Sequence, residues 1–243
     1  MIAPTPEHQI VNINSPELGC RMVAQHICSA RQPELDQWVE FLVRPDAPWN
    51  ELGPLEFVEL GYRERGLLFD QDILRRCISV ARHFPESTWF SVNIHPGSLH
   101  RDSFVGFVRR ELDRQEVSAK RLIFELVEFG GPVNLMASRA AIEELRDDGI
   151  RFALDDFGPG FSNLDLLGAQ LVDFVKLDRS MVRFVDSLPG YKRLIEGLQA
   201  MAERTGVQLV AEGAETRQQV AGLMELGVEW IQGFVFSRPA EIQ

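Results

Sequence analysis

The feature that most constrains the fold of this chain is a regular alternation between short apolar runs of strand length and longer segments with helical periodicity. Strands are predicted at residues 21–28, 37–44, 89–94, 121–128, 151–156, 172–178, 207–211 and 230–236. Helices are predicted at residues 54–64, 70–83, 98–114, 134–148, 162–167, 190–205 and 216–226. Strands that alternate with helices favour βα units around a parallel sheet. Eight strands in 243 residues predict an α/β fold, a TIM-like (β/α)8 barrel, which typically takes about 250 residues.

The first two predicted strands depart from this pattern, because only about eight residues separate 21–28 from 37–44. A crossover between parallel strands needs about a dozen residues or more. We therefore expect the first strand to run antiparallel to the second. Residues 1–19 carry three prolines and little periodicity, and we interpret them as a leader before one domain at residues 20–243.

The composition narrows the classes of ligand and location. A formal net charge of −11 and a pI near 5.0 argue against binding to a nucleic-acid polymer or to an anionic membrane. An anionic substrate would need metal ions or a few well-placed cations. The three cysteines have no CxxC spacing, which suits a reducing compartment. The sequence has no signal-peptide pattern and no apolar run of about 18 residues, so we expect a cytoplasmic protein without a membrane span.

Two adjacent carboxylates, Asp155 and Asp156, end the fifth predicted strand, and a turn with Gly158, Pro159 and Gly160 follows them. Neighbouring strand residues point to opposite faces, so a structural role for both acids would be unusual. A divalent cation would explain the pair, because oxygen ligands suit hard cations such as Mg²⁺. An Asx-type turn with one helix-capping Asp would explain it too, and this segment alone leaves both alternatives open.

Other strands also end in polar residues. In barrels, catalytic residues gather from the carboxyl ends of several strands. Residues in or just after the predicted strands are Glu40, Asn93, Glu125, Glu128, Asp155, Asp156, Lys176, Asp178, Glu212, Glu215 and Gln232. So many carboxylates would repel one another and would cost free energy to desolvate. Two divalent ions would neutralise them, and a pair of metal ions is the standard arrangement for phosphoester hydrolysis.

Two cations complete this predicted site. Lys176 lies beside the acids and is placed to orient or help deprotonate an attacking water. Arg44, at the end of the second strand, is placed to clamp a phosphate.

Taken in order, the motifs resemble the EAL domain family, the cyclic di-GMP phosphodiesterases of bacteria. The resemblance covers about residues 21–239. The matching segments are EFLVR at 40–44 (family EALLR), SVNI at 91–94 (VNLS), FELVE at 124–128 (ELTE), DDFGPGFSNL at 155–164 (DDFGTGYSSL), VKLD at 175–178 (KID), AEGAET at 211–216 (AEGVET) and QGF at 232–234 (QGY). Each motif alone is weak, but the ordered set is specific. The family fold is a barrel with an antiparallel first strand, as the short first gap already indicates.

The resemblance implies hydrolysis of cyclic di-GMP to linear 5′-pGpG with two Mg²⁺ or Mn²⁺ ions. By position, one ion would be held by Glu40, Asn93, Glu125 and Asp155. Asp155 would bridge to a second ion, which is also held by Asp156 and Glu212; the sequence leaves Glu212 open as a ligand or as the general base. Lys176 would contact the nucleophilic water, and Gln232 would orient the site. The residues implied to hold the dinucleotide are Gln25, Leu42 and Arg44.

Glu128 lies an odd number of positions from Glu125, so the two should not share a face of the strand. We expect Glu128 to support catalysis indirectly, by accepting hydrogen bonds from Ser162 or from backbone amides of residues 158–163, and not as a metal ligand. Relatives use this loop as a dimer contact, so a homodimer is expected. No sensor, receiver or cyclase domain is recognised in the chain, so we expect regulation through a regulatory protein partner, the leader or oligomerisation.

Four residues depart from the family pattern without removing a catalytic group: Phe41, His95, Val127 and Pro159. The alternative function is a catalytically weak cyclic di-GMP receptor or a protein-interaction module, because some relatives lose metal ligands. The intact set of predicted ligands favours the enzyme.

Overall fold

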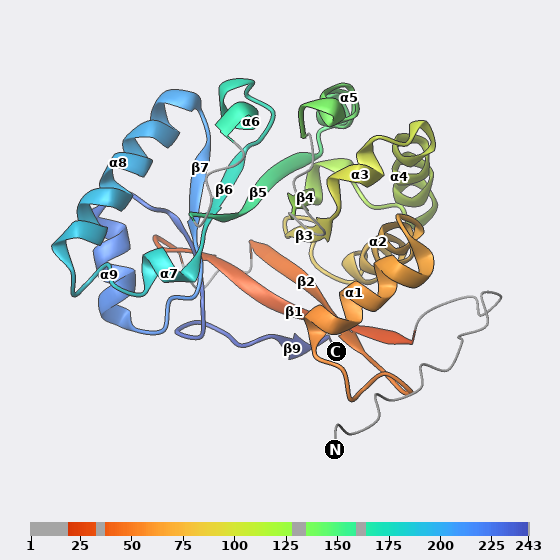
Figure 1. Cartoon of the computed structure of the whole chain (residues 1–243), viewed down its shortest axis with the longest axis horizontal. Coiled ribbons are helices and arrows are strands. Elements are labelled where there is room, and N and C mark those ends of the chain that lie inside the picture. Colours follow the sequence, from red (N-terminus) through yellow and green to blue (C-terminus); the bar gives the residue numbers. More distant parts are fainter. Residues whose placement is uncertain (1–18, 33–36, 128–134, 159–163, 243) are drawn as a thin grey trace, which may run out of the picture.

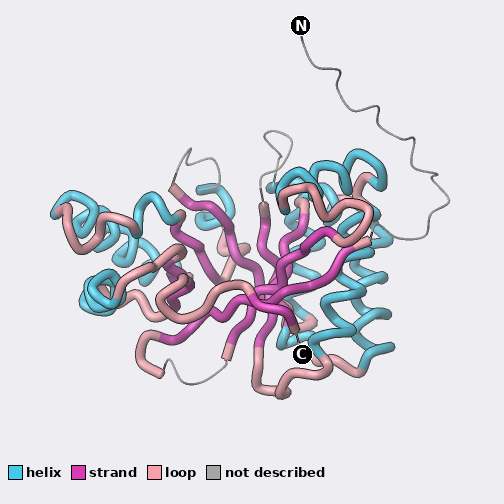
Figure 2. Tube along the Cα trace, turned by 90° about the horizontal axis from the view of Figure 1, so that it is seen from below, coloured by secondary structure: helices cyan, strands magenta, loops and turns pink. Residues whose placement is uncertain are grey.

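The computed structural model describes residues 19–32, 37–127, 135–158 and 164–242. The strands of these residues form one sheet in the order β2-β3-β4-β5-β6-β7-β8-β1, and β1 also pairs with β2, so the sheet closes into a barrel. Figure 2 shows the strands gathered in the middle of the molecule with helices on either side of them. The predicted barrel is therefore confirmed.

The barrel strands differ in direction as the sequence predicts. Strands β2 to β8 are parallel to their neighbours, whereas β1 is antiparallel to both β2 and β8. Their bounds are β1 (Cys20–Ser29), β2 (Trp38–Pro45), β3 (Trp89–Ile94), β4 (Leu122–Leu126), β5 (Arg151–Phe157), β6 (Phe174–Leu177), β7 (Gln208–Ala211) and β8 (Trp230–Gln232). A short strand, β9 (Ala240–Glu241), pairs with β1; its two exposed residues gave no periodic signal in the sequence.

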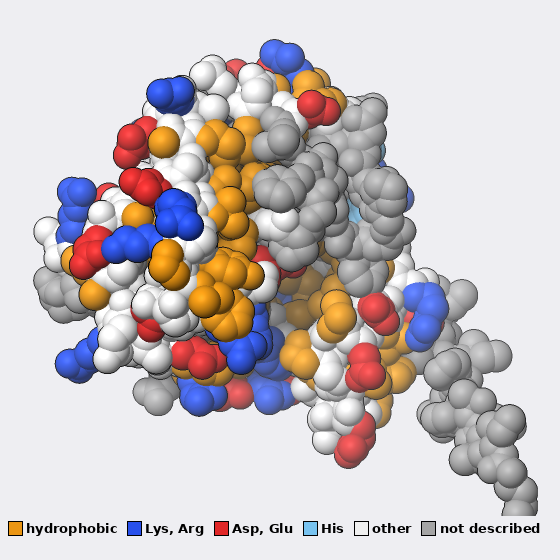
Figure 3. Space-filling model, turned by 60° about the vertical axis from the view of Figure 1, so that its left-hand side comes forward, with side chains coloured by type: hydrophobic (Ala, Val, Ile, Leu, Met, Phe, Trp, Pro, Cys, Tyr) orange, Lys and Arg blue, Asp and Glu red, His pale blue; other side chains and the backbone are white. Residues whose placement is uncertain are grey.

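Helices cover the outside of the barrel (Figure 1). They are α1 (Pro54–Arg65), α2 (Leu68–Ala81), α3 (Pro96–Leu99), α4 (Asp102–Gln115), α5 (Arg139–Asp147), α6 (Leu164–Gly168), α7 (Arg179–Val182), α8 (Pro189–Thr205) and α9 (Arg217–Glu225), with 3₁₀ turns at Ala119–Arg121 and Leu135–Ser138. Each helix in the described residues is too short or too polar to span a bilayer. On the face in Figure 3, basic side chains are interspersed with acidic ones, which gives this face no broad basic surface.

Several predicted boundaries differ from those in the structure. The helix predicted at 98–114 is two helices, because the backbone is extended at Arg101. The strand predicted at 230–236 ends at Gln232, because the chain turns after it and the Phe236 and Ser237 amides both donate to the Gly233 carbonyl at 3.1 Å. The strand predicted at 172–178 ends at Leu177, since the Asp178 carboxylate instead caps α7 by accepting a 2.9 Å hydrogen bond from the Ser180 amide.

One end of the barrel interior is filled by an apolar cluster that we call the floor. It comprises Ile27, Trp38, Ile123, Ala153, Phe174, Val210 and Trp230, with Trp89 packed against it. The centroid of the Trp38 ring lies 4.6 Å from the ring centroid of Phe174 and 5.6 Å from that of Trp230. The Trp38 indole nitrogen donates a 3.0 Å hydrogen bond to the Ser91 hydroxyl, so its one polar atom is satisfied. The floor therefore closes the barrel beneath the carboxyl ends of the strands.

Strands β1 and β2 extend beyond the rest of the sheet. Their pairing continues to the end of β2, whereas β2 pairs with β3 only as far as Phe41 and Val92. Past that point they form a two-stranded ribbon (Figure 1). Because side chains alternate along a strand, Glu40, Leu42 and Arg44 lie on one face of β2, and Phe41 packs into the core. The ribbon thus carries part of the barrel's inner face out past the neighbouring strands.

Candidate active site

Polar side chains form a layer directly above the floor. In six strands a floor residue is followed two positions later by a polar residue, and period-two alternation places both on the inner face of the barrel. The polar residues reached in this way are Glu40, Glu125, Asp155, Lys176, Glu212 and Gln232. Asn93 takes the same level in β3, where it pairs in register with Glu125. The fold therefore brings together the residues that the sequence predicts as ligands.

Lys176 lies at the centre of this layer and is 1% exposed. Its ammonium nitrogen is 2.7 Å from a carboxylate oxygen of Glu212 and 3.2 Å from one of Asp155. It also contacts the carboxylate of Glu125 and lies 3.7 Å from that of Glu40. Four carboxylates thus surround one cation, and the charges of the layer do not balance.

The excess of acids shifts the pKa values of the cluster. Burial raises the pKa of Glu125 well above its ordinary value, and the neighbouring Glu40 carboxylate adds to the shift. Burial also raises the pKa of Glu212 to about 8, because the attraction of Lys176 offsets only part of the cost. Burial alone would lower the pKa of Lys176, but the surrounding carboxylates outweigh it and raise that pKa. A divalent cation would relieve the same repulsion that proton uptake relieves here.

Several buried oxygen atoms in the layer accept no hydrogen bond within the described part of the chain. Among the described residues, the atoms Asn93 Oδ1, Glu125 Oε1, Asp155 Oδ1 and Gln232 Oε1 are buried without a hydrogen bond. Oxygen atoms of Asp155, Asp156 and Glu212 also lie within 4.8 Å of one another. Buried polar atoms are normally hydrogen-bonded, and oxygen donors are those that hard divalent cations prefer. The donor set therefore fits metal ions of this type.

The backbone of β5 explains how two adjacent acids reach one site. The pairing of β5 with β6 shifts register between Leu154 and Phe157, which is a bulge. Asp156 has a φ of 51°, in the left-handed region that Asp tolerates better than most residues. A bulge re-aims a side chain, so the rule that neighbours point to opposite faces does not hold here. Both acids then face the cavity, and burial raises the pKa of Asp156, with Asp155 adding to the shift.

Amide side chains hold Glu40 from both sides. Asn93 donates a 3.0 Å hydrogen bond to Oε1 of Glu40, and Gln232 donates one of 2.6 Å to Oε2. Gln232 also donates to the carbonyl oxygen of the Gln25 side chain at 3.3 Å, and Gln25 donates to the Ser237 carbonyl at 3.1 Å. Gln25 is thus engaged beside the acidic layer, and its predicted contact with a dinucleotide stays a prediction.

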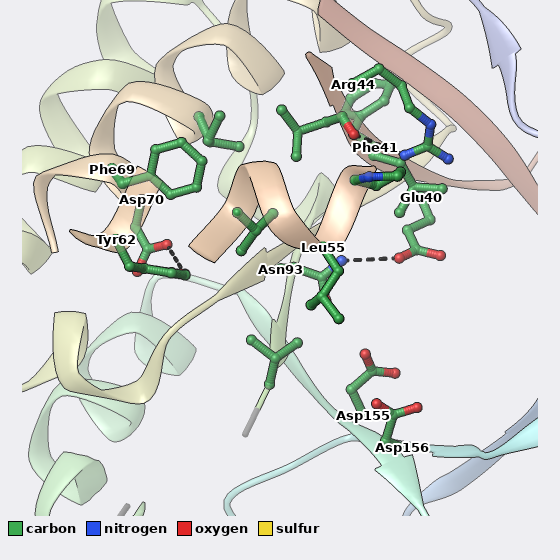
Figure 4. Close-up of a pocket in the computed structure, with 16 residues that line it drawn as sticks. Glu40, Phe41, Arg44, Leu55, Tyr62, Phe69, Asp70, Asn93, Asp155 and Asp156 are labelled. Atoms are coloured by element: carbon green, nitrogen blue, oxygen red, sulfur yellow. Dashed lines mark hydrogen bonds between the residues drawn. The ribbon is translucent and has the colours of Figure 1, made fainter. Parts of the chain in front are cut away.

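A cavity of about 380 Å³, open to solvent, lies next to the acidic layer. Figure 4 shows its two sides, with Glu40, Asn93, Asp155 and Asp156 on one and Tyr62, Phe69 and Asp70 on the other. Leu42 and Arg44 line it from the ribbon. Burial lowers the pKa of Arg44, and the negative charge of Glu40 opposes that shift.

Sequence reasoning missed the wall of the cavity. Side chains of α1 and α2 form it: Leu55, Val58, Tyr62, Phe69, Asp70 and Ile73. All belong to the amphipathic pattern that predicts the two helices, so nothing in that pattern separates cavity residues from core residues. The departures from the family pattern do have local roles: Phe41 packs against Phe84 and Phe90, and the His95 side chain caps α3. Glu128, Pro159 and Ser162 lie outside the described residues.

The fold and the layer together define a class, a (β/α)8-type barrel with a candidate divalent-metal site at the carboxyl ends of its strands. Residues 17–239 match the EAL domain family. The chain belongs to this family.

Similar proteins come from several bacteria. The chain is 33% identical over 224 residues to the cyclic di-GMP phosphodiesterase NbdA of Pseudomonas aeruginosa, covering 88% of this chain and 28% of NbdA. It is 30% identical over 157 residues to the cyclic di-GMP phosphodiesterase PdeL of Escherichia coli, covering 64% of this chain and 43% of PdeL. The chain thus spans less than half the length of these relatives.

Solved structures agree with the fold. BlrP1 of Klebsiella pneumoniae, in a complex with calcium and cyclic di-GMP, superposes with a TM-score of 0.81 at 27% identity, covering 98% of this chain and 60% of that one. The PaMucR phosphodiesterase, in a complex with cyclic di-GMP, gives a TM-score of 0.80 at 25% identity, covering 91% of this chain and 92% of that one.

Proposed function

We propose that the chain is a metal-dependent phosphodiesterase that hydrolyses cyclic di-GMP to linear 5′-pGpG. The observation that carries the proposal is the buried layer in which four carboxylates surround Lys176 beside a cavity that also contains Arg44. NbdA and PdeL, named as cyclic di-GMP phosphodiesterases, support the activity. The BlrP1 and PaMucR complexes with cyclic di-GMP support the ligand.

In this proposal two Mg²⁺ or Mn²⁺ ions bind the layer. Glu40, Asn93, Glu125 and Asp155 would hold one ion, and Asp155, Asp156 and Glu212 would hold the other. When bound, such ions lower the pKa of a water ligand and neutralise charge on a phosphate. A BlrP1 structure with manganese and cyclic di-GMP supports the choice of cation.

The residues of the chain then have separate tasks. The Lys176 ammonium lies between Asp155 and Glu212, where it forms ion pairs with both and is placed to orient a water that these carboxylates also approach. Glu212 is the group placed to accept a proton there, unless it acts only as a ligand. Gln232 and Asn93 fix both oxygens of Glu40. The layer is therefore preorganised for charge that develops near Lys176.

The cavity supplies the binding of the dinucleotide. Arg44 is a cation on the same face of β2 as Glu40, and its guanidinium can contact a phosphate or a base edge. Leu42 and the apolar wall of α1 and α2 offer surface for a purine ring. Gln25 is proposed as a further contact. We further propose that residues 20–243 form the catalytic domain and that residues 1–19 form a leader. The enzyme is proposed to be cytoplasmic, and its activity is proposed to depend on Glu128, on a homodimer and on a regulatory partner.

The decisive experiment incubates the purified chain with cyclic di-GMP and Mn²⁺, Mg²⁺ or Ca²⁺ and identifies the products by chromatography. Linear 5′-pGpG should appear with Mn²⁺ and Mg²⁺. Ca²⁺ should inhibit, because its larger and looser coordination does not suit a closely spaced metal pair. Binding of cyclic di-GMP without any linear product at high enzyme concentration would identify the chain as a receptor instead.

A further inference from the structure

Asp70 is a buried carboxylate in the wall of the cavity, opposite the acidic layer. It lies in the first turn of α2 and is 2% exposed. Its Oδ1 accepts a 2.6 Å hydrogen bond from the Tyr62 hydroxyl. Its Oδ2 accepts hydrogen bonds from the His95 backbone amide at 3.0 Å and from the Ser98 hydroxyl at 2.5 Å. Three donors therefore surround this buried acid, and among the described residues no basic side chain forms an ion pair with it.

These donors come from two regions of the chain, α1 and the junction between β3 and α3. Tyr62 belongs to α1, His95 precedes α3, and Ser98 lies within α3. One carboxylate thus ties the two helices of the cavity wall to the junction that follows β3. A buried charge costs free energy unless hydrogen bonds compensate it, so a residue that serves only packing would be better apolar.

The junction after β3 needs such a tie. β3 pairs with β4 up to Ile94 and Leu126, but it pairs with β2 only up to Val92, because β2 leaves the sheet in the ribbon. Beyond Val92, the edge of β3 that faces β2 pairs with no other strand in the described residues. The His95 amide lies on that side and donates to Asp70.

Asn93 lies between the last β2–β3 pair and this hydrogen bond. Its amide nitrogen donates to Glu40 at 3.0 Å, and its amide oxygen is buried without a hydrogen bond among the described residues. Only Ile94 lies between it and His95, whose amide is anchored. The direction in which the Asn93 amide oxygen points therefore depends on how firmly the β3–α3 junction is held.

We propose that Asp70 is a positioning residue that holds the β3–α3 junction so that Asn93 presents its amide oxygen to the metal site beside Glu40. Through Tyr62 the same carboxylate makes the cavity wall and the ligand layer one rigid unit. This inference rests on the proposed function, because it requires the acidic layer to bind a divalent cation.

The test measures Mn²⁺ affinity by calorimetry on the full chain without substrate. Asp70→Ala should weaken Mn²⁺ binding by about 10–100-fold, the usual cost of losing a group that orients a metal ligand. Asp70→Asn keeps an acceptor for His95 and Ser98 and should restore most of the affinity. The matched control is Asp72→Asn. Asp72 lies two residues after Asp70 in α2, and in the described residues it pairs only with Arg65 and Arg75. Its Mn²⁺ affinity should equal that of the wild type.

A double-mutant cycle separates positioning from a general structural role. If Asp70 acts through Asn93, adding Asp70→Ala to Asn93→Ala should weaken Mn²⁺ binding no further. A further loss of similar size would overturn the proposal. Should Asp70→Ala fail to fold by circular dichroism, Ser98→Ala replaces it in the same cycle, since it removes one donor and keeps the carboxylate.

The outcomes also distinguish this inference from the proposed function. Wild-type affinity in Asp70→Ala would overturn the inference alone. A wild-type protein that binds no Mn²⁺ would overturn the proposed function, and the inference with it.

Discussion

The floor and the acidic layer are adjacent levels of one barrel, built by the same strands only two residues apart, yet they are held together in opposite ways. The floor consists of aromatic and aliphatic side chains in ring-to-ring contact. The layer above it consists of carboxylates and amides around Lys176. Floor residues gain stability from burial, whereas Glu125 and Glu212 lose it, since their pKa values are raised by the same burial.

The comparison teaches that the floor supplies the stability that the layer lacks. A well-packed apolar level beneath the acids fixes the strands at their spacing and excludes water from below. The acids can then converge although they repel one another. Mutations in the two levels should therefore fail in different assays, and the predictions below run from the largest expected effect to the smallest.

Glu40→Ala should have the largest effect. It removes a predicted metal ligand that both Asn93 and Gln232 hold in place. Mn²⁺ affinity and turnover of cyclic di-GMP should both collapse, by more than the 10²–10³-fold that one lost transition-state hydrogen bond typically costs. Glu225→Ala is the control, because Glu225 is an exposed acid paired with Lys192 on the outer helices. Turnover in Glu40→Ala equal to that of Glu225→Ala would remove Glu40 from the site.

Lys176→Ala should lower turnover by about 10²–10⁴-fold, the range for lost assistance to proton transfer, while cyclic di-GMP still binds. It should also destabilise the metal-free protein, because the four surrounding carboxylates lose their only close cation among the described residues. Added Mn²⁺ should recover that stability in a thermal melt. Near-normal turnover would show that Lys176 serves charge balance alone.

Phe174→Ala tests the floor. Phe174 lies directly below Lys176 and contacts Trp38, so the substitution should lower the free energy of unfolding by about 3–5 kcal/mol, measured by urea denaturation. In the fraction that remains folded, Mn²⁺ affinity should change by no more than a few-fold. If Mn²⁺ affinity fell while the free energy of unfolding stayed unchanged, the floor would act on the metal site directly, and the division of tasks between floor and layer would be wrong.

Asp70→Asn tests a third kind of buried side chain, an acid that hydrogen-bond donors hold in the wild type without a paired cation in the described residues. Burial raises the pKa of Asp70 to about 6. The folded state then binds this proton more tightly than the unfolded state, whose pKa is near 4, so this group's contribution to stability falls as the pH rises from about 4 to 6 and is constant above. The difference amounts to at most about 3 kcal/mol. Unfolding curves measured at pH 4 and pH 7 should show that the wild type loses more free energy of unfolding than Asp70→Asn as the pH rises. If the two proteins showed the same pH dependence, the raised pKa of Asp70 would be contradicted.

The sequence predicts the barrel, its antiparallel first strand and most of the layer, because short strands alternate with a period of two and their polar residues are few and conspicuous. It does not predict why Asp155 and Asp156 face one cavity, since the bulge and the positive φ of Asp156 leave no mark on the pattern. Nor does it predict Asp70, because an acid in the first turn of a helix is ordinary and its partners lie 25 and 28 residues further along the chain.

The ribbon of β1 and β2 also sets a length. Glu40 and Arg44 lie on the same face of β2, four residues apart, so at about 3.3 Å per residue their backbones are roughly 13 Å apart. That interval is fixed by backbone geometry and does not depend on side-chain rotamers. A ligand that contacts both the acidic layer and Arg44 must therefore extend over an interval of this order, whether it meets Arg44 with a phosphate or with a base edge. One residue inserted between Leu42 and Arg44 would turn the guanidinium to the opposite face of the strand and remove that length criterion without altering the metal site.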